Sequence, residues 1–120
     1  MKPFISRITL DMRDIVSRLC IRMKKGDTNR RLVVTLLDNY LPYQIPDRCT
    51  AKFWAKKPDG TIISEDCTIE NNTVVYDLPS NISSLEGRVY CELALHYEDS
   101  QNAGSPRFCI DIASSIFDVS

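Results

Sequence analysis

The stretch from Thr50 to Thr61 constrains the fold of this chain more than any other part of the sequence. In its first half, apolar residues at positions 51, 53 and 55 alternate with Lys52, Trp54 and Lys56. A period of two is typical of a strand with one buried face and one solvent-facing face. The Pro-Asp-Gly sequence at positions 58–60 then favours a tight turn, because proline presets φ and glycine accepts a positive φ. Extended chain resumes at Thr61, so the stretch predicts a β-hairpin.

The same alternation predicts further strands on both sides of this hairpin. They cover residues 7–12, 18–24, 31–37, 73–78, 88–97 and 108–112. Residues 12–23 also carry the apolar spacing of an amphipathic helix, and there we favour a turn near residues 13–17 followed by a strand. A single helical turn is expected near residues 80–85, with Ser80 as its N-cap and Gly87 as its stop. The predicted fold class is therefore all-β: an antiparallel β-sandwich of Ig-like or jelly-roll-like architecture with about seven or eight strands.

The chain of 120 residues is expected to form one domain, residues 1–120. Its core should span about residues 7–113, and a tail, residues 114–120, carries Ile116, Phe117 and Val119 and is expected to dock or to lead into a stalk. No apolar run approaches the ~18 residues that a membrane span needs, so membrane insertion is not expected. The N-terminus lacks the apolar segment of a signal peptide, which indicates synthesis in the cytoplasm.

Candidate catalytic and metal-binding groups are sparse. The single histidine, His96, lies on a predicted strand, where a half-exposed surface role is the commoner one. Five cysteines occur, and no two of them lie within three residues of each other, whereas zinc sites usually contain cysteines two to four residues apart. We expect buried free thiols, with a disulfide left open, and predict no enzymatic activity, no cofactor and no metal. The cysteines are Cys20, Cys49, Cys67, Cys91 and Cys109.

Charge is distributed unevenly along the chain, although the net charge is only −1. Residues 1–60 contain 13 Lys and Arg against 6 Asp and Glu, and residues 61–120 contain 2 against 10. If the fold interleaves the two halves, the contrast cancels in space. If it does not, the molecule carries a basic face and an acidic face that would steer contacts between copies or with a ring-shaped partner.

Trp54 is the residue most indicative of an interaction. It falls on the lysine-bearing, outward face of its predicted strand, opposite Phe53. We predict an interface formed by Trp54 with Lys52, Lys56 and Lys57. An equally weighted alternative is that the loop at residues 40–47 covers this face. A sugar-stacking platform or a nucleic-acid stack are weaker alternatives, and we expect no nucleic-acid partner.

Several motifs occur in a specific order along the chain, and together they resemble one protein family. They are Lys25-Gly26-Asp27-Thr28, Thr35-Leu36-Leu37-Asp38 with Pro42-Tyr43, Ala51-x-Phe53 leading to Lys57-Pro58-Asp59-Gly60-Thr61, Val74-x-Tyr76-x-Leu78-Pro79, Gly87-Arg88-Val89-Tyr90-Cys91, and Ser105-Pro106-x-Phe108. Between about Ile8 and Ile112 the chain resembles the N-terminal domain of the baseplate upper protein of tailed phages and prophages of Gram-positive bacteria.

This resemblance implies a β-sandwich module of the virion that holds the receptor-binding apparatus for host recognition on the central ring of the tail baseplate. The implied role is structural, and the implied partners are the distal-tail ring protein and the receptor-binding protein, with homo-oligomers left open. In such proteins the chain continues into a trimerising stalk, whereas this sequence stops at Ser120. The alternative function is a carbohydrate-binding module that recognises cell-wall glycans.

Overall fold

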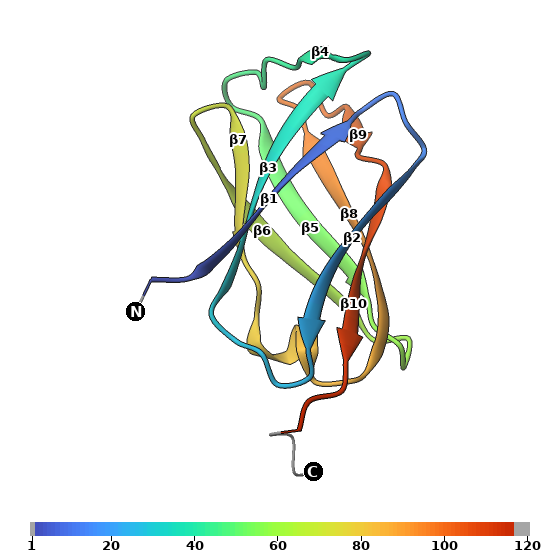
Figure 1. Ribbon diagram of the computed structural model, residues 1–120. Helices are drawn as coiled ribbons and strands as arrows, with labels where there is room; N and C mark the ends of the chain where they lie inside the picture. Colours follow the sequence, from blue (N-terminus) through green and yellow to red (C-terminus); the bar gives the residue numbers. More distant parts are fainter. Residues whose placement is uncertain (1, 117–120) are drawn as a thin grey trace.

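Alternating sequences form the strands of the domain, as Figure 1 shows for the computed structural model, which describes residues 2–116. In this part of the chain the elements are β1 (Phe4–Asp11), β2 (Val16–Lys24), β3 (Arg30–Asp38), β4 (Leu41–Pro42), β5 (Thr50–Lys56), β6 (Ile62–Glu70), β7 (Thr73–Asp77), the 3₁₀ helix η1 (Ser80–Ser83), β8 (Gly87–His96), β9 (Asn102–Gly104) and β10 (Arg107–Ala113). The all-β class is confirmed, and so is the choice of a strand over a helix for β2.

The strands follow one another in a single curved sheet, in the order β1-β3-β7-β6-β5-β8-β10-β2. Strand β6 belongs to both layers of this sheet, because residues 62–67 pair with β5 and residues 68–70 pair with β7. The sheet therefore folds over on itself and encloses the core, with β1 and β2 as its two terminal strands (Figure 1). The short strands β4 and β9 attach to β3 and β8.

Two strand pairs differ from the predicted antiparallel arrangement. Strand β1 pairs with β3, and β2 pairs with β10, in parallel. Parallel neighbours need a long connection between them, and here the partners are far apart in the sequence. Alternation of side chains specifies which face of a strand is buried, and it carries no information about which strand lies alongside.

The core is formed by the inward-facing residues of both layers. Phe53, the central apolar residue of the hairpin, is fully buried, and its ring stacks on Tyr76 with centroids 4.5 Å apart. Most strands contribute alternate residues to this core. The largest fully buried side chains are Phe53, Phe108, Leu10, Leu32, Leu36, Ile82, Leu93, Leu95, Ile110, Val34, Val74 and Val89.

Smaller differences from the expectations lie in the connections. The loop at residues 40–47 contains the short ladder of β4 with β3, and the connection from β8 to β10 contains the short ladder of β9 with β8. The N-cap of η1 is Pro79, and no side chain caps it, so the prediction of Ser80 as N-cap was wrong. Phe117 and Val119 of the predicted tail lie outside the described residues. Within residues 2–116 no helix has the length and apolar character needed to cross a membrane.

Candidate functional site: a patch on the outer face of the sheet

The outward-facing residues of β5 lie at the centre of a broad sheet surface. Because β5 has a partner on each side, Trp54 is opposite Ser64 of β6 and opposite Glu92 of β8. Two residues further along β5, and on the same face, Lys56 is opposite Ile62 of β6 and Tyr90 of β8. The pairing thus places Trp54 and Lys56 among side chains from the two neighbouring strands, β6 and β8.

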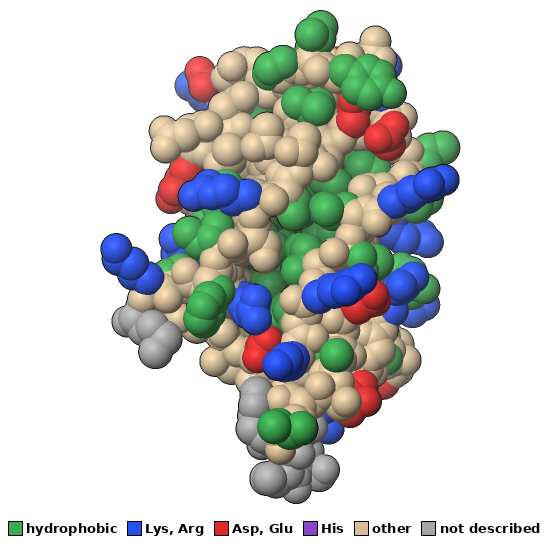
Figure 2. All heavy atoms as spheres, in the orientation of Figure 1, with side chains coloured by type: hydrophobic (Ala, Val, Ile, Leu, Met, Phe, Trp, Pro, Cys, Tyr) green, Lys and Arg blue, Asp and Glu red, His purple; other side chains and the backbone are tan. Residues whose placement is uncertain are grey.

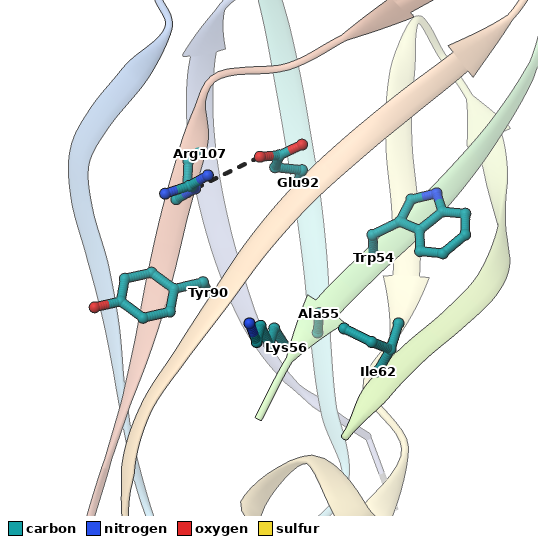
Figure 3. Close-up of a pocket in the computed structure, with 7 residues that line it drawn as sticks. All are labelled: Trp54, Ala55, Lys56, Ile62, Tyr90, Glu92 and Arg107. Atoms are coloured by element: carbon teal, nitrogen blue, oxygen red, sulfur yellow. Dashed lines mark ion pairs between the residues drawn. The ribbon is translucent and has the colours of Figure 1, made fainter. Parts of the chain in front are cut away.

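These side chains surround a shallow hollow of about 380 Å³. We call this surface the outer-face patch; it is formed by Trp54, Lys56, Ile62, Tyr90, Glu92 and Arg107. In Figure 3, Tyr90 and Arg107 lie on one side of the hollow, Trp54 and Ile62 on the other, and Lys56 between them. Trp54 is 41% exposed, Tyr90 47% and Ile62 54%. The alternative that a loop covers Trp54 is therefore not favoured by its exposure.

Charged groups hold the aromatic rings of the patch in place. The Lys52 ammonium lies 5.5 Å from the centroid of the Trp54 ring, and the Arg107 guanidinium lies 5.9 Å from that of Tyr90. Both distances are within the range of a cation–π interaction. Arg107 also forms an ion pair with Glu92 at 3.5 Å, the contact that is dashed in Figure 3.

Lys52 does not line the hollow, and neither does Lys57, the fourth residue of the predicted interface. Its side chain is 8% exposed, and its Nζ donates a hydrogen bond of 2.6 Å to the Ser84 hydroxyl beside η1. Its backbone N–H and C=O close the hairpin turn, with Thr61 and Gly60 as partners. The position of Lys57 indicates a structural role in the turn.

Four members of the patch were not predicted from the sequence: Ile62, Tyr90, Glu92 and Arg107. Each lies on the outward face of its own strand, and that much follows from alternation. Their proximity to Trp54 depends on the pairing of β5 with β6 and β8 and of β8 with β10. The exposed aromatic at Tyr90 within a long alternating strand was the one available signal.

A second cluster of chemically competent side chains lies on β2 and β10. The thiols of Cys20 and Cys109 and the carboxylate of Asp111 lie within 4.8 Å of one another, because Cys20 and Cys109 are direct cross-strand neighbours. Burial, and then hydrogen bonds to Cys109 and Asp111, raises the pKa of the Cys20 thiol to about 12. Arg88 donates two hydrogen bonds to Asp111. The Asp111 carboxylate is thus already engaged by Arg88, and a metal at this cluster would have to displace that contact and the proton of the Cys20 thiol.

The outer-face patch contains two aromatic residues and one arginine. Aromatic residues and arginine are enriched in the centres of protein interfaces, where they provide buried area and directional polar contacts. His96, the single histidine, lies on the end of β8 that pairs with Thr50, and its Nδ1 is 2.7 Å from the Asn102 amide oxygen. The structure does not place His96 in the outer-face patch.

Comparisons with known proteins agree with the all-β architecture. Among solved structures the chain is similar to the N-terminal domain of phage TP901-1 ORF48, with a TM-score of 0.68 and 14% sequence identity. The match covers 92% of this chain and 98% of that chain. At this identity the match shows a shared fold. No curated protein has a significant match to the chain.

The fold thus defines a small all-β domain of the kind found in a phage protein. The model of the BppU N-terminal domain family matches residues 5–120, nearly the whole sequence, and the chain belongs to this family. The resemblance to the baseplate upper protein, first indicated by ordered motifs, is confirmed. Membership makes the domain a structural module of a phage tail baseplate.

Proposed function

We propose that this domain docks the receptor-binding apparatus onto the ring of the tail baseplate, and that the outer-face patch is the docking surface. The observation that carries the proposal is the exposure of Trp54, Tyr90 and Ile62 around one shallow hollow on a four-stranded face of a baseplate-family domain. Large apolar side chains grouped on a rigid sheet surface are typical of protein–protein contacts.

The arrangement of charges supports a protein partner. Lys52, Lys56 and Arg107 surround the aromatic residues, and Glu92 is the acidic group among them. A desolvated aromatic centre with a charged rim is the usual anatomy of a specific interface. The partners that we propose are the distal-tail ring protein and the receptor-binding protein, and the proposed role requires no catalysis. We further propose that the chain is made in the bacterial cytoplasm before assembly.

Substitution of Trp54 tests the docking surface. The wild-type domain and Trp54→Ala would be mixed with the distal-tail ring protein of the same phage, and complex formation measured by light scattering and co-purification. A hot-spot residue contributes at least about 2 kcal/mol, so we expect Trp54→Ala to weaken binding on the order of thirtyfold. Tyr40→Ala is the matched control, because Tyr40 is an 85%-exposed aromatic outside the patch. Equal binding by a folded Trp54→Ala would refute the proposal.

A carbohydrate-binding function is the second candidate, and one observation favours it. Trp54 and Tyr90 are exposed on the same face, as stacking residues for a glycan would be. However, Lys52 and Arg107 already lie over these two rings, so a sugar would have to displace both cations. A cell-wall glycan array distinguishes the two functions: saturable binding that is lost in Trp54→Ala supports the glycan site, and no binding supports protein docking.

A further inference from the structure

The two terminal strands of the sheet, β1 and β2, each have only one partner strand. Strand β1 pairs with β3, and β2 pairs with β10, but within residues 2–116 no ladder joins β1 to β2. The sheet is therefore open along one line, which we call the β1–β2 seam: residues 5–9 of β1 and residues 18–24 of β2. Natural proteins usually protect such edges, because unpaired backbone groups are templates for another strand.

The direction of the β1 backbone groups follows from two hydrogen bonds. The N–H of Phe4 donates to the C=O of Asn29 at 2.9 Å, and the N–H of Met12 donates to that of Leu37 at 2.8 Å. The backbone N–H and C=O groups of the even-numbered residues of this segment therefore point toward β3. Because backbone groups alternate along a strand, the N–H and C=O groups of Ile5, Arg7 and Thr9 point into the seam.

The backbone groups of β2 alternate in the same way. The N–H of Lys25 donates to the C=O of Ala113 at 2.7 Å, so the backbone groups of odd-numbered residues at this end of β2 point toward β10. The backbone groups of Cys20 and Arg22 therefore point into the seam from the opposite side. The N–H of Lys24, next in this series, donates to the Asp27 carboxylate at 2.9 Å, which ends the open edge.

The floor of the seam is apolar. The inward-facing Ile8 and Leu10 of β1 and Ile21 and Met23 of β2 are buried, and Leu19 is half-buried. Figure 2, in the orientation of Figure 1, shows hydrophobic side chains in a hollow between the positions of these two strands, with lysine and arginine side chains on both sides. A strand entering the seam would place alternate apolar side chains on this floor.

The rim of the seam is basic. Between Lys2 and Lys25 the chain contains seven Lys and Arg and only two Asp. One of these, Asp11, uses its carboxylate to accept the backbone N–H groups of three residues in the neighbouring turns. Arg7, Arg18 and Arg22 are exposed on the outward face of the two edge strands. Outward side chains of an added strand would lie among these cations and would be most stable if acidic.

We propose that the β1–β2 seam binds an extended acidic segment of another baseplate polypeptide, whose residues alternate between apolar and acidic side chains. The segment adds one strand to the sheet, its main-chain groups pairing with Ile5, Arg7 and Thr9 on one side and with Cys20 and Arg22 on the other. Strand addition obtains affinity from main-chain hydrogen bonds and specificity from alternate side chains. The seam lies on strands other than those of the outer-face patch, so this inference goes beyond the proposed docking surface.

A synthetic peptide of five Glu-Val repeats, blocked at both ends, tests the seam directly. We expect saturable binding in fluorescence anisotropy, and slowed amide exchange by NMR at Ile5, Arg7, Thr9, Cys20 and Arg22. The affinity should fall as salt is raised, because the rim contacts are screened. A Lys-Val peptide of the same length should not bind. Absence of binding, equal binding of the Lys-Val peptide, or protection elsewhere on the sheet would overturn the proposal, as would a dimer of the domain formed through this seam.

Two pairs of variants sharpen this test without disturbing the core. Thr9→Pro removes an N–H that faces the seam, which an edge strand tolerates, whereas Thr9→Val retains it. Arg22→Glu reverses a rim charge, whereas Arg22→Lys retains it. We expect Thr9→Pro and Arg22→Glu each to weaken peptide binding on the order of tenfold, and the two retaining variants to bind like wild type. Trp54→Ala should bind the peptide normally, so failure of the seam and failure of the outer-face patch are distinguishable.

Discussion

At the scale of single residues, Gly87 is a position where both the backbone conformation and a close contact oppose substitution. Its φ is +123°, and a Cβ added there would lie 2.9 Å from Cγ of Pro58 in the hairpin turn. Both the left-handed conformation and the close approach favour glycine. We predict that Gly87→Ala lowers the free energy of unfolding by about 1–3 kcal/mol, measured by urea denaturation.

Substitutions at two other glycines distinguish the cost of the positive φ from the cost of the close contact. Gly60 has φ of +87° with open space around it, so Gly60→Ala introduces strain without a clash and should cost about 1 kcal/mol. Gly104 has neither feature, so Gly104→Ala should be close to neutral. An order of Gly104, Gly60, Gly87 in increasing cost is the expected result. A Gly87→Ala variant as stable as Gly104→Ala would show that this account of the turn is wrong.

Alanine substitutions of Lys57 and Trp54, which are three positions apart, should affect different properties: stability for Lys57 and docking for Trp54. Lys57→Ala removes a buried aliphatic stem and the hydrogen bond to Ser84, and we expect it to cost about 1–2 kcal/mol of stability. Since Lys57 does not line the outer-face patch, the same variant should bind the ring protein like wild type at a temperature where it is folded. Calorimetry and co-purification of both variants would check the two effects separately, and weakened docking by a fully folded Lys57→Ala would contradict this assignment.

At the scale of elements, Asp11 joins two turns at one end of the domain. Its carboxylate accepts the N–H groups of Arg13, after β1, and of Asn39 and Tyr40, after β3. The hydrogen bond from Arg13, followed by that from Tyr40, lowers the pKa of Asp11 below its ordinary value of 3.8. The contribution of Asp11 to stability is therefore fully present above pH 3.8 and is lost as the pH falls through the lowered pKa.

This linkage predicts a pH-dependent effect of Asp11→Asn. Below the lowered pKa both side chains are neutral, so the difference in unfolding free energy between wild type and Asp11→Asn should shrink as the pH falls from 5 to below 3. Urea denaturation at several pH values measures this difference, and Asp14→Asn, a nearby exposed substitution, is the control. A difference that stayed constant over this range would contradict the assigned interactions of Asp11.

The elements themselves could largely be predicted from the sequence, because alternation and turn chemistry act locally. The hairpin of β5 and β6, the strand β3 with its buried Leu32, Val34 and Leu36, and the turn at η1 all follow from such local signals. The parallel pairing of β1 and β2 with distant strands could not be predicted, since register between remote segments is set by packing of the whole core. For the same reason, the proximity of Tyr90 and Arg107 to Trp54 could not be predicted from the sequence.

At the scale of the whole molecule, the fold only partly cancels the charge asymmetry of the sequence. Basic residues of the first half pair with acidic residues of the second, as in Arg31 with Asp77 at 2.6 Å and Arg48 with Glu98 at 2.9 Å. Strands β1 and β2 still carry an excess of positive charge, with Arg7, Arg18, Arg22 and Lys24 against Asp11, although Asp111 of β10 lies opposite Arg22. The domain therefore presents two distinct surfaces, an aromatic patch and a basic seam.

The most direct measurement of the central claim is hydroxyl-radical footprinting of the domain, alone and within assembled tail baseplates, read out by mass spectrometry. We predict that Trp54 and Tyr90 are oxidised in the isolated domain, in keeping with their exposure, and protected in the particle. If Trp54 and Tyr90 are oxidised as readily in assembled baseplates as in the isolated domain, the outer-face patch is not the docking surface.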